Sequence, residues 1–153
     1  MIYWIIILSS AGFSISQLYK IKNKLALGIT IVQIIAILFS LAGNFGLPYF
    51  VDIAWVIYVM SLFAVLFFSF YSDLTSIKKN IIILMTIPIL ITNIFQILHF
   101  PGAGWLGISC VISLGIYFWM ISNRKDFADE LGFLTMMAAD ALIIFLIRII
   151  WLV

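Results

Sequence analysis

The sequence predicts an all-α integral membrane protein, a bundle of six transmembrane helices, and two observations lead to this fold class. The first is composition: 66% of the 153 residues are hydrophobic and only 9% are charged, against about 25% charged in an average soluble domain. Because so few charged side chains cannot cover a water-soluble body, lipid must be the solvent for most of the surface. The second is that the apolar residues fall into blocks long enough to cross a bilayer as helices.

Charged and turn-forming residues divide the chain into six apolar blocks. They cover residues 1–19, 25–43, 49–71, 81–99, 102–122 and 131–152. Nothing remains for a soluble region, so we expect residues 1–153 to form a single transmembrane domain. The first block has a short apolar core followed by Ser9, Ser10 and Ala11, which is also typical of a removable signal peptide. Since no Lys or Arg precedes that core, we expect a retained helix.

Basic residues predict how the blocks cross the membrane. The loops after blocks one, three and five hold seven of the eight basic residues, and the eighth, Arg148, lies near the end of block six. The seven are Lys20, Lys22, Lys24, Lys78, Lys79, Arg124 and Lys125. Lys and Arg are enriched in cytoplasmic loops. We therefore expect a multi-pass protein of the bacterial inner membrane with both termini outside the cytoplasm.

The three prolines have local structural interpretations. Pro48 and Pro101 fall where blocks three and five begin, and the missing N–H costs nothing at the first turn of a helix. Pro88 falls inside block four. It removes the backbone hydrogen bond to the carbonyl of Leu84, which predicts a kink in this helix.

Acidic residues before block six predict where that helix starts. Asp126 and Asp129 stand three residues apart, as the two members of a capping box do. We therefore expect the sixth helix to begin near Phe127, and Asp129 and Glu130 need no catalytic role.

A half-chain repeat is one hypothesis for the organisation of the bundle. An offset of 79 residues aligns Gln17 with Gln96 and residues 27–30 with residues 106–109. Each half would hold three spans, so the halves would form a 3+3 inverted repeat like those of secondary transporters. The alternative is chance, since segments rich in Leu, Ile, Gly and Ser match easily.

The turn between blocks four and five carries a resemblance to a known family. It reads Ile97-Leu98-His99-Phe100-Pro101-Gly102-Ala103. Over about residues 88–118 the chain resembles an "HxPGA" helical hairpin of small Bacteroidetes membrane proteins, which include the stator subunit of the gliding-motility and type 9 secretion motor. The resemblance implies that one helix ends at the histidine and the next starts at the proline. Proton-motor function does not carry over, because the intramembrane glutamate of the family is absent and its expected position falls near Leu114.

The residue inventory excludes most catalytic and cofactor chemistry. One His and one Cys provide neither a zinc cluster nor a CxxC pair, and no glycine-rich phosphate loop is present. His99 and Cys110 are separated by about 14 Å of helical rise, too far for a nucleophile and its base. A net charge of +2 is too small to indicate nucleic acid. We therefore expect no enzyme, no cofactor, no bound metal and no nucleic-acid partner.

Polar side chains inside the blocks form the candidate site. Asp140 lies near the bilayer centre, where a carboxylate costs about 2.5–3.5 kcal/mol and should face the bundle with a partner. Gln33, at the same depth, is the expected partner, and Asn93 lies slightly further out. Two interpretations of Asp140 stay open: a protonated residue that bonds to Gln33 and holds the bundle together, or a proton- or cation-coupling site. We expect Gln96 and His99 on the inward face of block four, because exposed amide and imidazole groups would lack partners in hydrocarbon. The complete candidate site is Asp140, Gln33, Asn93, Gln96, His99, Asp52 and Arg148.

Two function classes remain. The first is a non-catalytic subunit or docking partner of a bacterial envelope complex, in contact with the lipid bilayer and with other membrane proteins or copies of itself. Short loops and the stator-like hairpin favour it, as do small residues at the spacing of close helix packing. These pairs are Ser10 with Ser14, Gly12 with Ser16 and Ser109 with Ser113. The alternative is a small secondary transporter or solute-binding component, with a small molecule or ion at a polar site lined by blocks two, four and six.

Overall fold

The computed structural model describes residues 2–100 and 103–152, and this part of the chain is helical without strands. Its helices are α1 (Ile2–Gln17), a 3-10 turn η1 (Leu18–Lys20), α2 (Lys24–Asn44), α3 (Tyr49–Tyr71), α4 (Ser76–Ile97), α5 (Ala103–Ser122) and α6 (Leu131–Leu152). All six α-helices are long and apolar enough to cross a membrane. The predicted fold class, an all-α bundle of six transmembrane helices, is confirmed.

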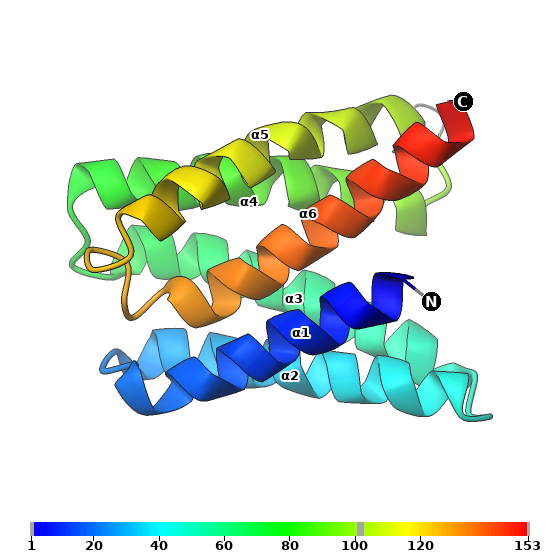
Figure 1. The fold of residues 1–153 in the computed structure, drawn as a ribbon, viewed down its shortest axis with the longest axis horizontal. Coiled ribbons are helices and arrows are strands. Elements are labelled where there is room, and N and C mark those ends of the chain that lie inside the picture. Colours follow the sequence, from blue (N-terminus) through cyan, green and yellow to red (C-terminus); the bar gives the residue numbers. More distant parts are fainter. Residues whose placement is uncertain (1, 101–102, 153) are drawn as a thin grey trace.

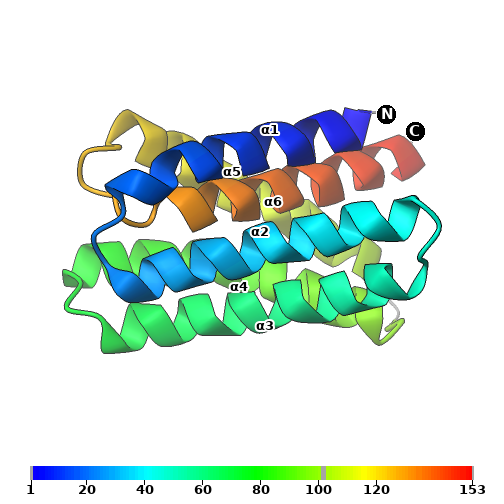
Figure 2. The ribbon, with the colours of Figure 1, turned by 90° about the horizontal axis from the view of Figure 1, so that it is seen from below.

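The helices run up and down, and α6 lies at the centre of the bundle. Both termini and the α2–α3 turn lie at one end, with the α1–α2, α3–α4 and α5–α6 connections at the other (Figures 1 and 2). α6 contacts α1, α2, α4 and α5, whereas α3 packs between α2 and α4. Every side chain from Leu131 to Ala139 is buried. The half of α6 that leads to Asp140 is therefore fully surrounded by protein.

Two helix starts are fixed by side chains that cap backbone N–H groups. Asn23 Oδ1 accepts from the N–H groups of Leu25 and Ala26, which starts α2. Thr75 Oγ1 accepts from the N–H of Lys78 at 3.4 Å, so α4 begins at Ser76 rather than at residue 81. The sequence prediction of this boundary was too late because lysine was assigned to the loop.

The predicted start of the sixth helix near Phe127 is wrong. Residues 123–130 form consecutive turns, and α6 begins at Leu131. Phe127 is buried, and its carbonyl accepts from the N–H groups of Glu130 and Leu131. Asp129 does not pair with Asp126; its Oδ1 accepts from the N–H of Lys22 at 2.7 Å. Asp129 thus ties this loop to the α1–α2 connection instead of capping a helix.

Small residues let neighbouring helices approach closely. Ser14 Oγ donates to the carbonyl oxygen of Gly132 at 2.8 Å, which joins α1 to α6. Gly132 also lets α2 approach α6 closely, because a Cβ added at Gly132 would lie 3.0 Å from Cγ2 of Thr30 in α2. Ser113 Oγ donates to the carbonyl oxygen of Met85 at 2.7 Å, which joins α5 to α4. At Ser14 and Ser113, two of the residues in the predicted pairs, close packing is found within the chain.

The proline predictions have different outcomes. Pro48 is the residue before α3, with φ −56°, and Pro88 lies inside α4, which continues to Ile97. The predicted kink at Pro88 and the inverted repeat stay predictions. Pro101 and Gly102 lie outside the described residues, so the predicted start of a helix at Pro101 stays a prediction as well.

Candidate functional site

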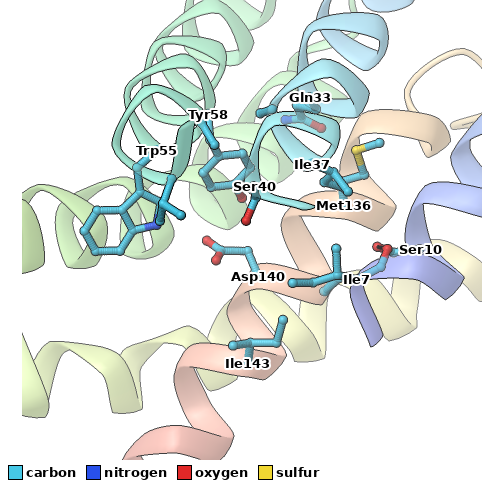
Figure 3. Close-up of a pocket in the computed structure, with 14 residues that line it drawn as sticks. Ile7, Ser10, Gln33, Ile37, Ser40, Trp55, Tyr58, Met136, Asp140 and Ile143 are labelled. Atoms are coloured by element: carbon cyan, nitrogen blue, oxygen red, sulfur yellow. Dashed lines mark hydrogen bonds between the residues drawn. The ribbon is translucent and has the colours of Figure 1, made fainter. Parts of the chain in front are cut away.

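A cavity of about 160 Å³ lies between α1, α2, α3 and α6 (Figure 3). Its polar and aromatic lining residues are Ser10, Gln33, Ser40, Trp55, Tyr58 and Asp140. Along α2 it extends from Gln33 to Ser40, about 10 Å of helical rise. Two of its lining side chains, Val51 and Trp55, are exposed and belong to the first turns of α3. The rim of the cavity therefore lies toward the end of the bundle that holds both termini.

Asp140 projects from α6 into this cavity and has a partner on α4. One N–H of the Asn93 amide donates to Asp140 Oδ2 at 2.9 Å, and Nδ2 also donates to the carbonyl oxygen of Ile89 at 3.0 Å. Asn93 is only 1% exposed. The structure thus joins Asp140 to Asn93, another residue of the candidate site, whereas the expected hydrogen-bond partner was Gln33. Equal depth in the membrane does not mean that two side chains turn toward each other.

Gln33 and Tyr58 bring further polar groups to the cavity. Gln33 is 0% exposed, and within the described part of the chain neither Nε2 nor Oε1 has a hydrogen-bond partner. The hydroxyl group of Tyr58 is also buried, and it faces the carboxylate of Asp140. Buried polar groups are nearly always hydrogen-bonded, since an unpaired group costs about 1–3 kcal/mol. The amide of Gln33 is therefore available to a polar molecule in the cavity, and the hydroxyl oxygen of Tyr58 can still accept a hydrogen bond.

The electrostatic character of the cavity comes from one carboxylate. Asp140 is its only charged lining residue among those described. Arg148, on the same helix, packs against α5 instead: a Cβ added at Gly107 would lie 2.7 Å from Arg148 Cγ. Asp52 is exposed in the first turn of α3 and forms no ion pair with Arg148 in the described structure. Arg148 and Asp52 therefore do not belong to the cavity, although the sequence placed them in the same site.

The prediction that His99 faces the bundle is wrong. His99 is exposed and follows the end of α4 with φ 52°. Its N–H donates to the carbonyl oxygen of Gln96, and the N–H of Phe100 donates to that of Phe95, the two bonds of a Schellman motif. The rings of Phe95 and Phe100 pack edge to face at 5.3 Å. His99 thus ends a helix, and Gln96, half-buried, does not line the cavity.

Sequence reasoning missed Tyr58, Trp55 and Ser40. Tyr58 carried a usable signal, because it lies deep inside an apolar block, whereas tyrosines of membrane proteins concentrate at the interfaces. Its hydroxyl needs a polar environment at that depth. Trp55 and Ser40 lie nearer the ends of their helices, where neither residue type is unusual. No comparable signal marked them.

A second polar cluster lies at the opposite end of the bundle. Glu130, 3% exposed, has its Oε2 3.9 Å from Nζ of Lys78. The ammonium group of Lys78 also lies over the ring of Phe127, 5.2 Å from its centroid. Burial raises the pKa of the Glu130 carboxyl above its ordinary value, and the charge of Lys78 only partly opposes this. The cluster fastens the α5–α6 loop to α4 and is distant from the cavity.

No protein-family model matches the chain, and neither a curated protein nor a solved structure matches it. The class of the molecule therefore comes from its own fold and site. It is an all-α membrane bundle whose apolar helices enclose a cavity with a carboxylate, an amide and a phenol hydroxyl.

Proposed function

We propose that this protein is a small solute-binding membrane protein of the transporter type, with its solute in the Asp140 cavity. The observation that carries the proposal is the amide of Gln33 in the wall of the cavity that holds Asp140, because this amide is fully buried and bonded to no described protein group. An intramembrane ionisable residue in a cavity indicates a substrate or ion site. This is the alternative function of the sequence analysis, which expected a site lined by the second, fourth and sixth blocks, whereas the cavity is lined by α1, α2, α3 and α6.

The walls of the cavity support access from one side. Its rim, near the first turns of α3, includes the exposed side chains of Val51 and Trp55. Toward the other end, Phe133 of α6 packs edge to face on Phe68 of α3 at 5.8 Å, and both are buried. A site open toward one end and closed toward the other is the arrangement expected of an alternating-access transporter.

The distribution of basic residues supports an orientation for this arrangement. Seven of the eight Lys and Arg residues of the chain lie at the closed end, in its connections or in the first turns of α2 and α4. By the positive-inside tendency, that end lies in the cytoplasm and the cavity opens outward in the inner membrane of a bacterium.

Flux into proteoliposomes tests the proposed function. The probes are radiolabelled ethanolammonium, glycine and lactate, which represent a cation, a zwitterion and an anion. We expect protein-dependent uptake of at least one probe, and Ser40→Phe should abolish it by filling the cavity. Ser122→Phe is the matched control, because Ser122 is exposed at the end of α5 and does not line the cavity. Uptake of none of the probes, or equal uptake by the Ser40→Phe protein, contradicts the proposal.

A second candidate function, docking to another membrane protein or to a second copy, is favoured by one specific feature. Ser9, Gly12 and Ser16 form a strip of small residues on the exposed face of α1. A Cβ added at Gly12 would meet no atom of the described residues within 4 Å, so no other described helix covers α1 at this position. Strips of this kind let helices associate closely in membranes. The resemblance of residues 88–118 to the stator hairpin supports the same proposal of an envelope-complex subunit.

Cross-linking in native membranes tests the docking proposal. We expect a cross-linked species larger than one chain, and Gly12→Leu should reduce it because the larger side chain blocks close approach. The open space around Gly12 means that the folded chain accommodates leucine. A single-chain product, or cross-linking unchanged by Gly12→Leu, contradicts docking through this face.

A further inference from the structure

We propose that the solute bound at Asp140 is a small primary ammonium ion, a protonated alkylamine no larger than about four carbons. This inference rests on the proposed function and specifies the chemical class of its solute. It combines the charge of the cavity, the hydrogen-bonding groups that face it and its size.

The charge of the cavity selects a cation. Asn93 donates to Oδ2 of Asp140, and the other polar side chain that faces this carboxylate is the neutral hydroxyl of Tyr58. Among the described lining residues none is basic, and the side chain of Arg148 is held against Gly107 of α5. A carboxylate surrounded by low-dielectric protein attracts a cation strongly and disfavours an anion. A neutral solute would leave the carboxylate without a counter-charge.

The polar groups match an ammonium head. An ammonium ion has three N–H donors and no acceptor. Asp140 Oδ1, Gln33 Oε1 and the hydroxyl oxygen of Tyr58 are acceptors from three different helices around the cavity. In Figure 3 the hydroxyl groups of Tyr58 and Ser40 and the carboxylate of Asp140 face the same space. The site thus offers acceptors to the head group from more than one direction.

The remaining walls match a short hydrocarbon body rather than a bare metal ion. Ile7, Ile37 and Ile143 face the cavity, and the ring of Trp55 forms part of its wall. Calcium and magnesium require about six oxygen ligands, which walls made mainly of hydrocarbon do not provide. Its volume of about 160 Å³ is close to that of a cavity able to hold benzene, about 150 Å³. Butylammonium is a molecule of this class.

Calorimetric titration of the purified, full-length protein in detergent tests the inference. The probes are butylammonium, uncharged butanol, anionic butyrate and sodium ion alone. We expect saturable binding of butylammonium only. Asp140→Asn should weaken it by about tenfold to a hundredfold, because a hydrogen bond to a charged group is lost. Asp52→Asn removes an exposed carboxylate outside the cavity and should leave binding unchanged.

Each outcome bears on one of the two proposals. Butanol binding as tightly as butylammonium, unchanged affinity in Asp140→Asn, or Asp140-dependent binding of sodium alone would overturn the ammonium assignment and leave a solute site. If Asp140→Asn does not fold, Ser40→Phe retains the carboxylate and fills the cavity, and binding that survives in it refutes the assignment. If butylammonium does not bind, but glycine or lactate is taken up and Ser40→Phe abolishes this uptake, only the ammonium assignment is rejected and the proposed function stands. Failure of both binding and flux rejects the proposed function as well.

Discussion

Replacing Asn93 by leucine should destabilise the bundle, because Asp140 then loses its hydrogen-bond donor on α4. Hydrogen bonds to charged groups contribute about 1.5–3 kcal/mol in soluble proteins. Side-chain pairs between membrane helices average nearer 0.6 kcal/mol, with a maximum near 1.7 kcal/mol. The Asn93–Asp140 bond has an ordinary length of 2.9 Å, and Asn93 is fully enclosed. We therefore expect a coupling free energy of about 1–1.5 kcal/mol, toward the upper end of the membrane range.

A double-mutant cycle isolates this coupling. Unfolding free energies in mixed micelles are compared for wild type, Asn93→Leu, Asp140→Leu and the double variant. Asn93→Leu should destabilise the protein more than Asp140→Leu, because it leaves a buried carboxylate unpaired, whereas Asn93 can still donate to Ile89. The double variant should lose less unfolding free energy than the sum of the losses in the two single variants. If the destabilisation of the double variant equals the sum of the single destabilisations within about 0.5 kcal/mol, the assigned hydrogen bond is refuted.

Three further predictions concern other parts of the chain. Burial raises the pKa of Glu130, so the contribution of this residue to stability is present in acid and is lost as the pH rises through the raised pKa. In thermal unfolding scans, Glu130→Gln should remove this loss of stability at higher pH. A pH profile that is the same in the Glu130→Gln protein contradicts the assignment. Gly132→Ala should cost about 1–3 kcal/mol of unfolding free energy, because its Cβ would press on Thr30. Gly28→Ala meets no atom within 4 Å and is the matched control. Lys22→Cys should resist an impermeant thiol reagent in intact cells, and rapid labelling would reverse the proposed orientation.

The helices were predictable because lipid imposes a simple rule on composition. Apolar blocks of the required length coincide with all six helices, and only details at their ends differ. Lys78 and Lys79 were assigned to a loop, yet they belong to the first turn of α4. Their long side chains allow this, since Nζ of Lys79 lies over the ring of Phe70 at 4.4 Å while the backbone is helical. Charge alone therefore does not end a helix near the membrane surface.

The site was predictable in depth but not in rotation about each helix. The cost of an intramembrane carboxylate singled out Asp140, and its facing the bundle follows from that cost. Choosing between Gln33 and Asn93 requires the rotation of α2 and α4, which depends on packing throughout the bundle. The prediction for His99 was wrong for a local reason, because the left-handed backbone at the end of α4 directs its side chain outward. Tyr58 was missed because its ring made it look like part of the apolar block.

Cysteine accessibility at adjacent positions of α2 tests the central claim, an open polar cavity at Asp140, most directly. Ala36 lines the cavity, whereas Ile35, at the same depth, is on the outer surface of the bundle. In membranes, the Ala36→Cys protein should react with a small cationic methanethiosulfonate faster than with an anionic one, and the Ile35→Cys protein should react with neither. Cys110, the native thiol, is buried and provides the background rate. Equal reactivity at the two positions, or an unreactive Ala36→Cys protein, would contradict the account.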